Sequence, residues 1–92
     1  SHLGRAYFVA RRYGEAIDPF KHISHPNQFH HAFLAASFAM TNDMTAAATH
    51  ARSVLALDPN FSAEAYLRTL HYRRDADRDH HREALLRAAL PA

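Results

Sequence analysis

The sequence contains no cysteine and no tryptophan, and it has only two glycines. Without cysteine there is no disulfide, no cysteine-ligated zinc and no thiol nucleophile. The scarcity of glycine leaves little for tight hairpin turns, and the abundance of alanine favours helices. There is no run of eighteen apolar residues and no basic-then-apolar leader. We therefore expect no membrane span, no secretory signal and a cytoplasmic location.

Charge of either sign is modest. Eleven Lys and Arg residues stand against nine Asp and Glu residues, a formal net charge of +2 at pH 7. This density is too low to indicate nucleic-acid binding by itself. Lys21 is the only lysine, and such a preference for arginine is typical of a GC-rich bacterial coding sequence. The 92 residues can form one small domain or part of a larger one, and we treat residues 1–92 as a single domain.

Apolar residues recur at spacings of three and four along the chain, which predicts six helices. The breaks between them fall at Tyr13-Gly14, 24–27, 41–43, 58–60 and 74–77. Short linkers of this kind imply that neighbouring helices are antiparallel. We expect Thr45 to cap the fourth helix, Pro59 to end that helix and Ser62 to open the fifth.

The sequence also repeats itself with a period of 31 to 34 residues. A shift of 31 superposes Tyr7 on Phe38, and it also superposes Ala16 on Ala47. A further shift of 34 places Phe38 on Tyr72. A period in this range indicates stacked helical hairpins, none of which can bury its apolar face alone. The aromatic residue would fill the space between hairpins, and the small residue would let two helices cross closely.

Three segments carry a resemblance to a known family. They are Gly4-Arg5-Ala6-Tyr7-Phe8, Tyr13-Gly14-Glu15-Ala16-Ile17 and Val54-Leu55-Ala56-Leu57-Asp58-Pro59-Asn60. They resemble tetratricopeptide repeats, and the Leu-Asp-Pro-Asn close is especially typical of a full repeat. The resemblance implies an all-α, right-handed helical solenoid of about six antiparallel helices in three hairpins. Its parts would be a truncated repeat at 3–26, a full repeat at 27–60 and a degenerate C-terminal capping helix pair at 61–92.

The end of the chain carries a second resemblance. The segment runs Ser62-Ala63, Tyr66, Tyr72 and Leu85-Leu86-Arg87-Ala88-Ala89-Leu90-Pro91. It is similar to the closing segment of tetratricopeptide regions at the C-terminus of bacterial class III adenylate cyclases and some related transcriptional regulators. This implies that the chain is the C-terminal part of a multidomain bacterial signalling protein. A nucleotide cyclase domain would then belong to the parent protein and not to this chain.

The first repeat lacks its opening turn by comparison with the family, which implies that helical structure is absent upstream. Solenoid repeats bury their faces against neighbours, so a severed array leaves apolar residues without cover. We expect this of Leu3, of Tyr7 or Phe8, and of parts of Ile17 and Phe20. Exposed patches of identical molecules commonly pair about a two-fold axis, which predicts a homodimer through the N-terminal hairpin.

In tetratricopeptide domains the first helix of each hairpin lines a groove that holds a peptide or a partner helix. Carried over by position, the lining here is Arg5, Phe8, Val9, Phe29, Ala32, Phe33, Ala36 and Met40. Ala32, Phe33 and Ala36 stand where the chaperone-tail binders of the family carry lysines and asparagines. We therefore expect no clamp for a C-terminal carboxylate. The alternative is that some of these apolar residues are core, because aromatic stripes usually are.

No residue pattern predicts catalysis, a cofactor or a metal site. The serines lack a Gly-x-Ser-x-Gly setting, and there is no glycine-rich phosphate loop. The nine histidines include no pair at i, i+4, although Asp77–His81 and His71–Asp75 have that spacing. We therefore interpret the histidines as surface or partly buried residues. The arginines of the last third are interleaved with aspartates, which cancels much of their field.

These observations together predict a non-catalytic module that binds a protein or peptide partner, with no cofactor, no metal and no membrane. One alternative is a nucleic-acid-associated helical domain of a transcriptional regulator, which salt-dependent DNA binding would favour. The other is a metal-binding helical bundle, which stabilisation by zinc would favour.

Overall fold

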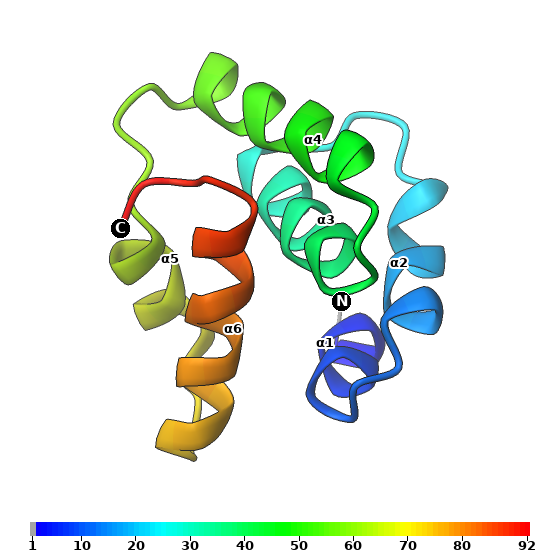
Figure 1. Cartoon of the computed structure of the whole chain (residues 1–92), viewed down its shortest axis with the longest axis vertical. Helices are drawn as coiled ribbons and strands as arrows, with labels where there is room; N and C mark the ends of the chain where they lie inside the picture. Colours follow the sequence, from blue (N-terminus) through cyan, green and yellow to red (C-terminus); the bar gives the residue numbers. More distant parts are fainter. Residues whose placement is uncertain (1) are drawn as a thin grey trace.

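The computed structural model describes residues 2–92, and over that range the chain forms six helices and no strand. Figure 1 shows their arrangement. The helices are α1 (His2–Val9), α2 (Tyr13–Lys21), α3 (Gln28–Met40), α4 (Met44–Leu57), α5 (Ala63–Leu70) and α6 (Asp75–Arg87). The prediction of an all-helical chain with six helices is confirmed. None of the six could serve as a membrane span, because each is too short or too polar.

The helix ends follow from local side-chain chemistry. Asn27 caps α3, because its side chain accepts hydrogen bonds from the backbone N–H groups of Phe29 and His30. Ser62 caps α5 by accepting from the N–H of Ala65, as predicted. Helix α4 ends at Leu57, just before Pro59, as predicted.

Three predicted boundaries are wrong. The break expected at 74–77 lies at 71–74, because α6 begins at Asp75. The cap of α4 is Asp43, whose side chain accepts from the N–H of Ala46, and Thr45 lies inside the helix. The first break lies at 10–12 and not at Tyr13-Gly14, since both of those residues are helical. Arg11 makes that break by adopting a left-handed conformation with a φ of 64°. Arginine is an unusual residue for this conformation, which is why glycine was the more obvious marker.

The first two hairpins pack closely side by side. Helix α3 is the central element and packs against α2, α4 and α6. Small residues make the α3–α4 approach possible, because Ala36, Ala39 and Ala47 are fully buried between larger side chains. Gly4 serves the same purpose in α1, since a Cβ there would lie 2.6 Å from a ring carbon of Phe20.

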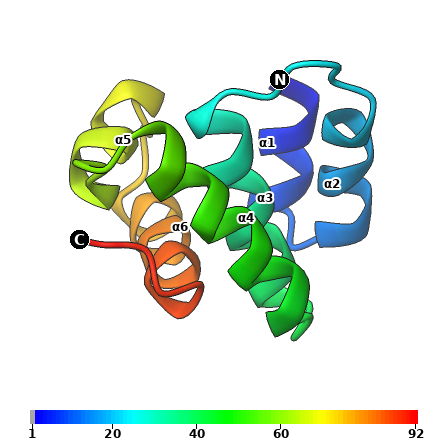
Figure 2. The same ribbon diagram turned by 90° about the horizontal axis from the view of Figure 1, so that it is seen from above.

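The third hairpin packs against the rest of the molecule mainly through α6. Figure 2 shows α5 on the outer side of α6, whereas α6 lies against α3. The ring centroid of Phe8 in α1 lies 4.8 Å from that of His80 and 4.6 Å from that of His81. The first and third hairpins therefore touch. This contact departs from a one-dimensional stack, in which each hairpin contacts only its neighbours.

We call this contact the histidine seam and define it by Phe8, Tyr13, Tyr72, His80 and His81. The Tyr13 hydroxyl lies 2.8 Å from Nε2 of His80, and the Tyr72 hydroxyl lies 2.8 Å from Nδ1 of His81. His81 is fully buried and its Nε2 has no hydrogen-bond partner among the described residues. Burial, assisted by the positive charges of neighbouring groups, lowers the pKa of His81 to about 3. The neutral imidazole thus serves as a packing residue.

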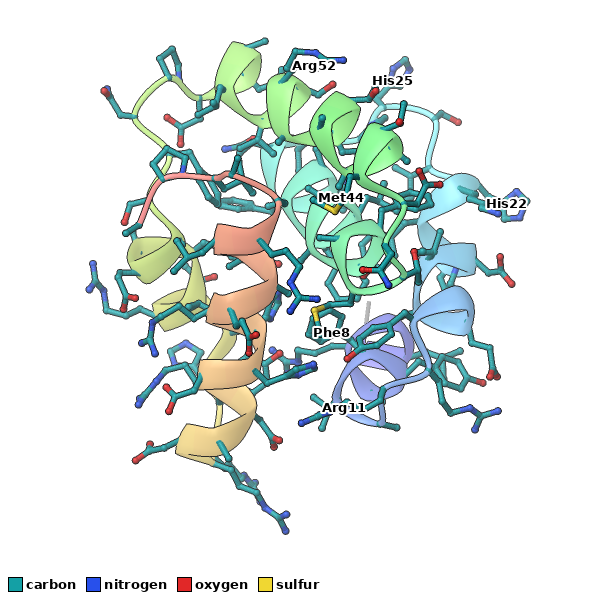
Figure 3. All side chains as sticks on the ribbon, in the orientation of Figure 1. Phe8, Arg11, His22, His25, Met44 and Arg52 are labelled. Atoms are coloured by element: carbon teal, nitrogen blue, oxygen red, sulfur yellow. The ribbon has the colours of Figure 1, made fainter. Side chains whose placement is uncertain are left out.

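The seam corrects two expectations. His80 and His81 are core residues and not surface or partly buried ones. Phe8, Ile17 and Phe20 are also buried, so only Leu3, at 56% exposure, fits the expected uncovered face clearly. In Figure 3 the Phe8 side chain lies at the centre of the molecule. The premise of the predicted homodimer is therefore wrong for these three residues, although the homodimer itself stays a prediction.

Candidate functional site

The structure divides the eight residues predicted to line a groove into two groups. Phe8, Ala32, Phe33 and Ala36 are buried in the core, with Phe33 retaining 4% exposure. The other four have solvent-accessible side chains: Arg5, Val9, Phe29 and Met40. The alternative that some of these residues are core is therefore correct for half of the set.

Two hollows in the surface collect most of the accessible members. The first has a volume of about 390 Å³ and is lined by Arg5, Phe20, Asn27, Phe29, His30, Phe33, Tyr66, Thr69 and Leu70. We call it the α1–α3–α5 groove, after the helices that supply most of its lining. The second hollow is shallower, and Arg5 and Val9 belong to its wall. Met40 lines neither of them.

The walls of the α1–α3–α5 groove are aromatic. Phe29 stacks on Tyr66 with ring centroids 5.9 Å apart and an angle of 13° between the ring planes. Phe20 stacks on Phe33 at 4.5 Å and 18°. Phe29 is nevertheless 43% exposed, so one face of an aromatic side chain remains open to a ligand.

Arg5 divides the groove from the second hollow. Its Nη1 donates a hydrogen bond of 2.7 Å to the backbone oxygen of Leu70, and its guanidinium lies 5.5 Å from the ring centroid of Tyr72. A guanidinium has five N–H donors, so most of them remain available. Arg5 forms no ion pair with any residue that the structure describes. The result is an uncompensated positive charge at the edge of an aromatic groove.

Tyr66 belongs to the same wall. The residue is 5% exposed, and its hydroxyl forms no hydrogen bond among the side chains that the structure describes. Burial raises the pKa of the Tyr66 phenol far above its ordinary range, so the hydroxyl is a neutral donor at physiological pH. A buried tyrosine hydroxyl usually has a partner, and its position in the wall makes it available to a ligand.

His30 supplies a third donor. Its Nδ1 accepts a hydrogen bond of 3.0 Å from the backbone N–H of Asn27, as part of the cap of α3. The neutral ring must then carry its proton on Nε2. Burial lowers the pKa of His30, which favours this neutral form.

The sequence interpretation omitted the residues that α5 supplies. The lining was carried over for the first two hairpins only, whereas Tyr66, Thr69 and Leu70 of α5 complete the groove. The rule that the first helix of each hairpin lines the groove, applied also to α5, would have pointed to this helix. Asn27 and His30 were not assigned a role either.

Several titratable residues outside the groove are engaged in structural contacts. No cluster of three or more potential metal ligands exists in the described part of the chain. His31 and His50 have their Nδ1 atoms 3.0 Å apart and form a hydrogen-bonded pair between α3 and α4. Nδ1 of His81 lies within hydrogen-bond distance of the Tyr72 hydroxyl, and Asp77 and His81 belong to no group of three potential ligands among the described residues.

The arginines of α6 are paired with carboxylates. Arg82 binds both Glu64 in α5 and Asp79 in α6, and these contacts raise its pKa and lower that of Glu64. Arg78 and Arg87 each lie within ion-pair distance of a carboxylate of α6. Most of these pairs lie within α6 at spacings of three or four residues. The pairing also leaves little free positive charge along α6.

Comparison with known proteins identifies no relative of this chain. The chain matches no protein-family model and no curated protein, and its fold matches no solved structure. The tetratricopeptide resemblance therefore depends on the residues quoted for it, and the role of the α1–α3–α5 groove has to be argued from the chemistry of its lining.

Proposed function

We propose that this chain is a non-catalytic interaction module that holds a short peptide segment of a partner protein in the α1–α3–α5 groove. The observation that carries the proposal is the combination of exposed Phe29 with two polar residues in the same lining, Arg5 and Tyr66. Among the described residues Arg5 has no ion-pair partner, and the Tyr66 hydroxyl has no hydrogen bond. Apolar walls with a few convergent polar groups are the usual composition of binding sites.

The size of the groove supports a short extended segment. Its volume of about 390 Å³ lies near the lower end of the range of about 300–1,000 Å³ that is common for ligand sites. An α-helix with its side chains is about 10–12 Å wide and buries a long apolar stripe. A few consecutive side chains of an extended chain match the groove better.

We further propose that the module is of the tetratricopeptide type and belongs to a multidomain bacterial signalling protein related to adenylate cyclases. Three helical hairpins and buried Ala16 and Ala47 agree with the repeat. The contact of α6 with α1 is a departure, which would make the third hairpin a closing element. The relation to cyclases is supported only by the residues of the C-terminal segment.

The nucleic-acid alternative has less support. Phosphate binding requires free cations, and Arg78, Arg82 and Arg87 of α6 are already paired with carboxylates. Arg68, Arg73 and Arg74 are exposed and form no ion pair among the described residues, but they line neither hollow except for Arg73 in the second. The metal-binding alternative lacks a cluster of ligands among the side chains that the structure describes. We therefore retain peptide binding as the single proposed function.

Selection from a displayed library of random seven-residue peptides tests the proposal. Selected sequences are then synthesised with a fluorescent label, and their affinity is measured by anisotropy. Phe29→Ala should weaken binding at least about tenfold, because truncating an aromatic anchor in a binding site commonly costs 2 kcal/mol or more.

Leu86→Ala is the matched control. Leu86 is 44% exposed, nearly the same as Phe29, but it lies on α6 outside the groove. It should leave peptide affinity unchanged. The proposal is wrong if no selected peptide distinguishes the Phe29 variant from the Leu86 variant.

A further inference from the structure

The lining of the α1–α3–α5 groove is unbalanced in its hydrogen-bonding groups. Among the nine lining residues, Arg5, Tyr66 and His30 carry hydrogen-bond donors, and none of the nine is an aspartate or glutamate. The backbone oxygen of Leu70 is already used by Arg5. A ligand that fills the groove therefore meets an excess of donors and one full positive charge.

We infer that the groove binds a peptide segment in which a side-chain carboxylate lies within one or two residues of an aromatic or branched aliphatic side chain. This inference rests on the proposed function and adds the chemical class of the segment. The carboxylate would accept hydrogen bonds from Arg5 and from the Tyr66 hydroxyl. The apolar side chain would lie on the exposed face of Phe29.

Arg5 is well placed to select a carboxylate. It has no anionic partner, and its hydrogen bond to the backbone oxygen of Leu70 holds the guanidinium at the groove without neutralising it. A planar guanidinium matches a carboxylate through paired N–H···O bonds, and such charge-assisted bonds are stronger than neutral ones. A cationic segment would be repelled by the same group.

Tyr66 strengthens the preference for an acceptor. Its hydroxyl has no partner within the described residues although the residue is almost completely buried. A phenol in this position loses its hydrogen bond to water when a ligand covers the groove. A ligand without an acceptor would leave that donor unsatisfied, at a free-energy cost that disfavours it.

The alternative anion is a phosphate group, and the groove suits it poorly. Sites that recognise phosphorylated side chains collect several arginines or lysines around one phosphate. Arg5 is the only lysine or arginine among the nine lining residues. One guanidinium beside a phenol and a neutral imidazole fits the single charge of a carboxylate.

The experiment uses the peptides selected from the seven-residue library, synthesised with acetylated N-termini and amidated C-termini. Capping leaves side chains as the only source of carboxylates. We expect aspartate or glutamate beside an aromatic or branched aliphatic residue to be enriched among the selected sequences. Replacing that acidic residue by its amide should weaken binding about tenfold, as expected for loss of a charge-assisted hydrogen bond.

A double-mutant cycle then assigns the carboxylate to Arg5. The acid-to-amide change in the peptide should weaken binding to the unmodified protein about tenfold but should change binding to Arg5→Gln by less than about twofold. Arg52→Gln is the control, because it removes the same charge from α4, outside the groove; Figure 3 shows Arg52 on the surface. The acid-to-amide change in the peptide should still weaken binding to Arg52→Gln about tenfold.

Tyr66→Phe keeps the experiment informative if Arg5→Gln loosens the contact between α1 and α5. Removal of a hydroxyl that has no partner in the described residues should leave the melting temperature unchanged while weakening binding about threefold to tenfold. The inference is wrong if the selected peptides depend on Phe29 but contain no enriched acid, or if the cycle shows no coupling to Arg5. In that case the proposed function stands. If no peptide depends on Phe29, both fail.

Discussion

The α3–α4 hairpin and the histidine seam hold the molecule together by different means. Between α3 and α4 the buried residues are small and apolar, with Ala36, Ala39 and Ala47 fully enclosed. At the seam, α6 reaches the first hairpin with two histidines that bond to tyrosine hydroxyls. The buried alanines of the first contact depend on shape, and its titratable pair, His31 and His50, is only partly buried. The second contact depends on a fully buried imidazole that has to stay neutral. The comparison teaches that the pH dependence of one small core can be concentrated where a histidine is completely enclosed.

The largest effect should come from removing the residue on which the seam is built. Phe8 is fully buried, and its ring contacts Phe33, His80 and His81. Phe8→Ala should lower the free energy of unfolding by about 3–5 kcal/mol, the usual cost of truncating a buried phenylalanine. Urea denaturation measures it. Phe29→Ala, at an exposed position, should cost much less, and equal losses would contradict the assignment of Phe8 to the core.

The second-largest effect should come from acid, which should weaken the histidine seam. The pKa of His81 is lowered to about 3 in the folded protein, against about 6.5 in an unfolded chain. The unfolded state therefore binds more protons below pH 6.5, so the contribution of His81 to stability is complete above that pH and is lost as the pH falls towards 3. At pH 4.5 the two-unit difference corresponds to a loss of about 3 kcal/mol. Melting temperatures measured by circular dichroism between pH 7 and pH 4 should show this decline.

His81→Leu tests the origin of that decline. It removes the titrating group while retaining an apolar side chain in the seam, so its melting temperature should depend less on pH than that of the unmodified protein. The dependence should not vanish, because burial also lowers the pKa of His80, His31 and His50. An unchanged pH profile in this variant would show that the seam is not the pH-sensitive part.

The smallest of the three effects should come from overfilling the α3–α4 contact. Ala47 is fully buried where the two helices approach each other. Ala47→Leu should cost about 1–3 kcal/mol, because a tightly packed interior accommodates extra methyl groups only by shifting backbone or rotamers. Its loss of stability should be the same at pH 7 and pH 5. A loss that grew with acid would remove the distinction between the two regions.

Much of the local structure was predictable. The spacing of apolar residues identified six helices, Pro59 marked the end of α4, and Ser62 marked the start of α5. These features depend on backbone geometry and on hydrogen bonds within a few residues. The errors at Thr45 and at Tyr13-Gly14 are equally local, because each misplaces a helix end by only a few residues. Asp43 was an equally good cap two residues earlier, and Arg11 took a conformation for which arginine has no particular preference.

The candidate groove was predictable only in part. Helical periodicity can tell which residues share a face, but it cannot tell whether a neighbouring hairpin covers that face. Phe29 and Phe33 lie one turn apart on α3, and yet one is 43% exposed and the other 4%. The difference arises because Phe20 and the seam cover Phe33, whereas Phe29 lies beside the open groove.

By itself, the sequence determined the helical class of this protein, the approximate ends of most helices and the small residues that let helices approach. Those properties follow from local sterics and local hydrogen bonds. The tertiary structure alone decided that α6 lies on α3 and Phe8, that His81 is buried and neutral, and that Arg5, His30 and Tyr66 meet at one groove. These three residues are far apart along the chain. Only the packing of hairpins, which minimises exposed apolar surface over the whole molecule, brings them together.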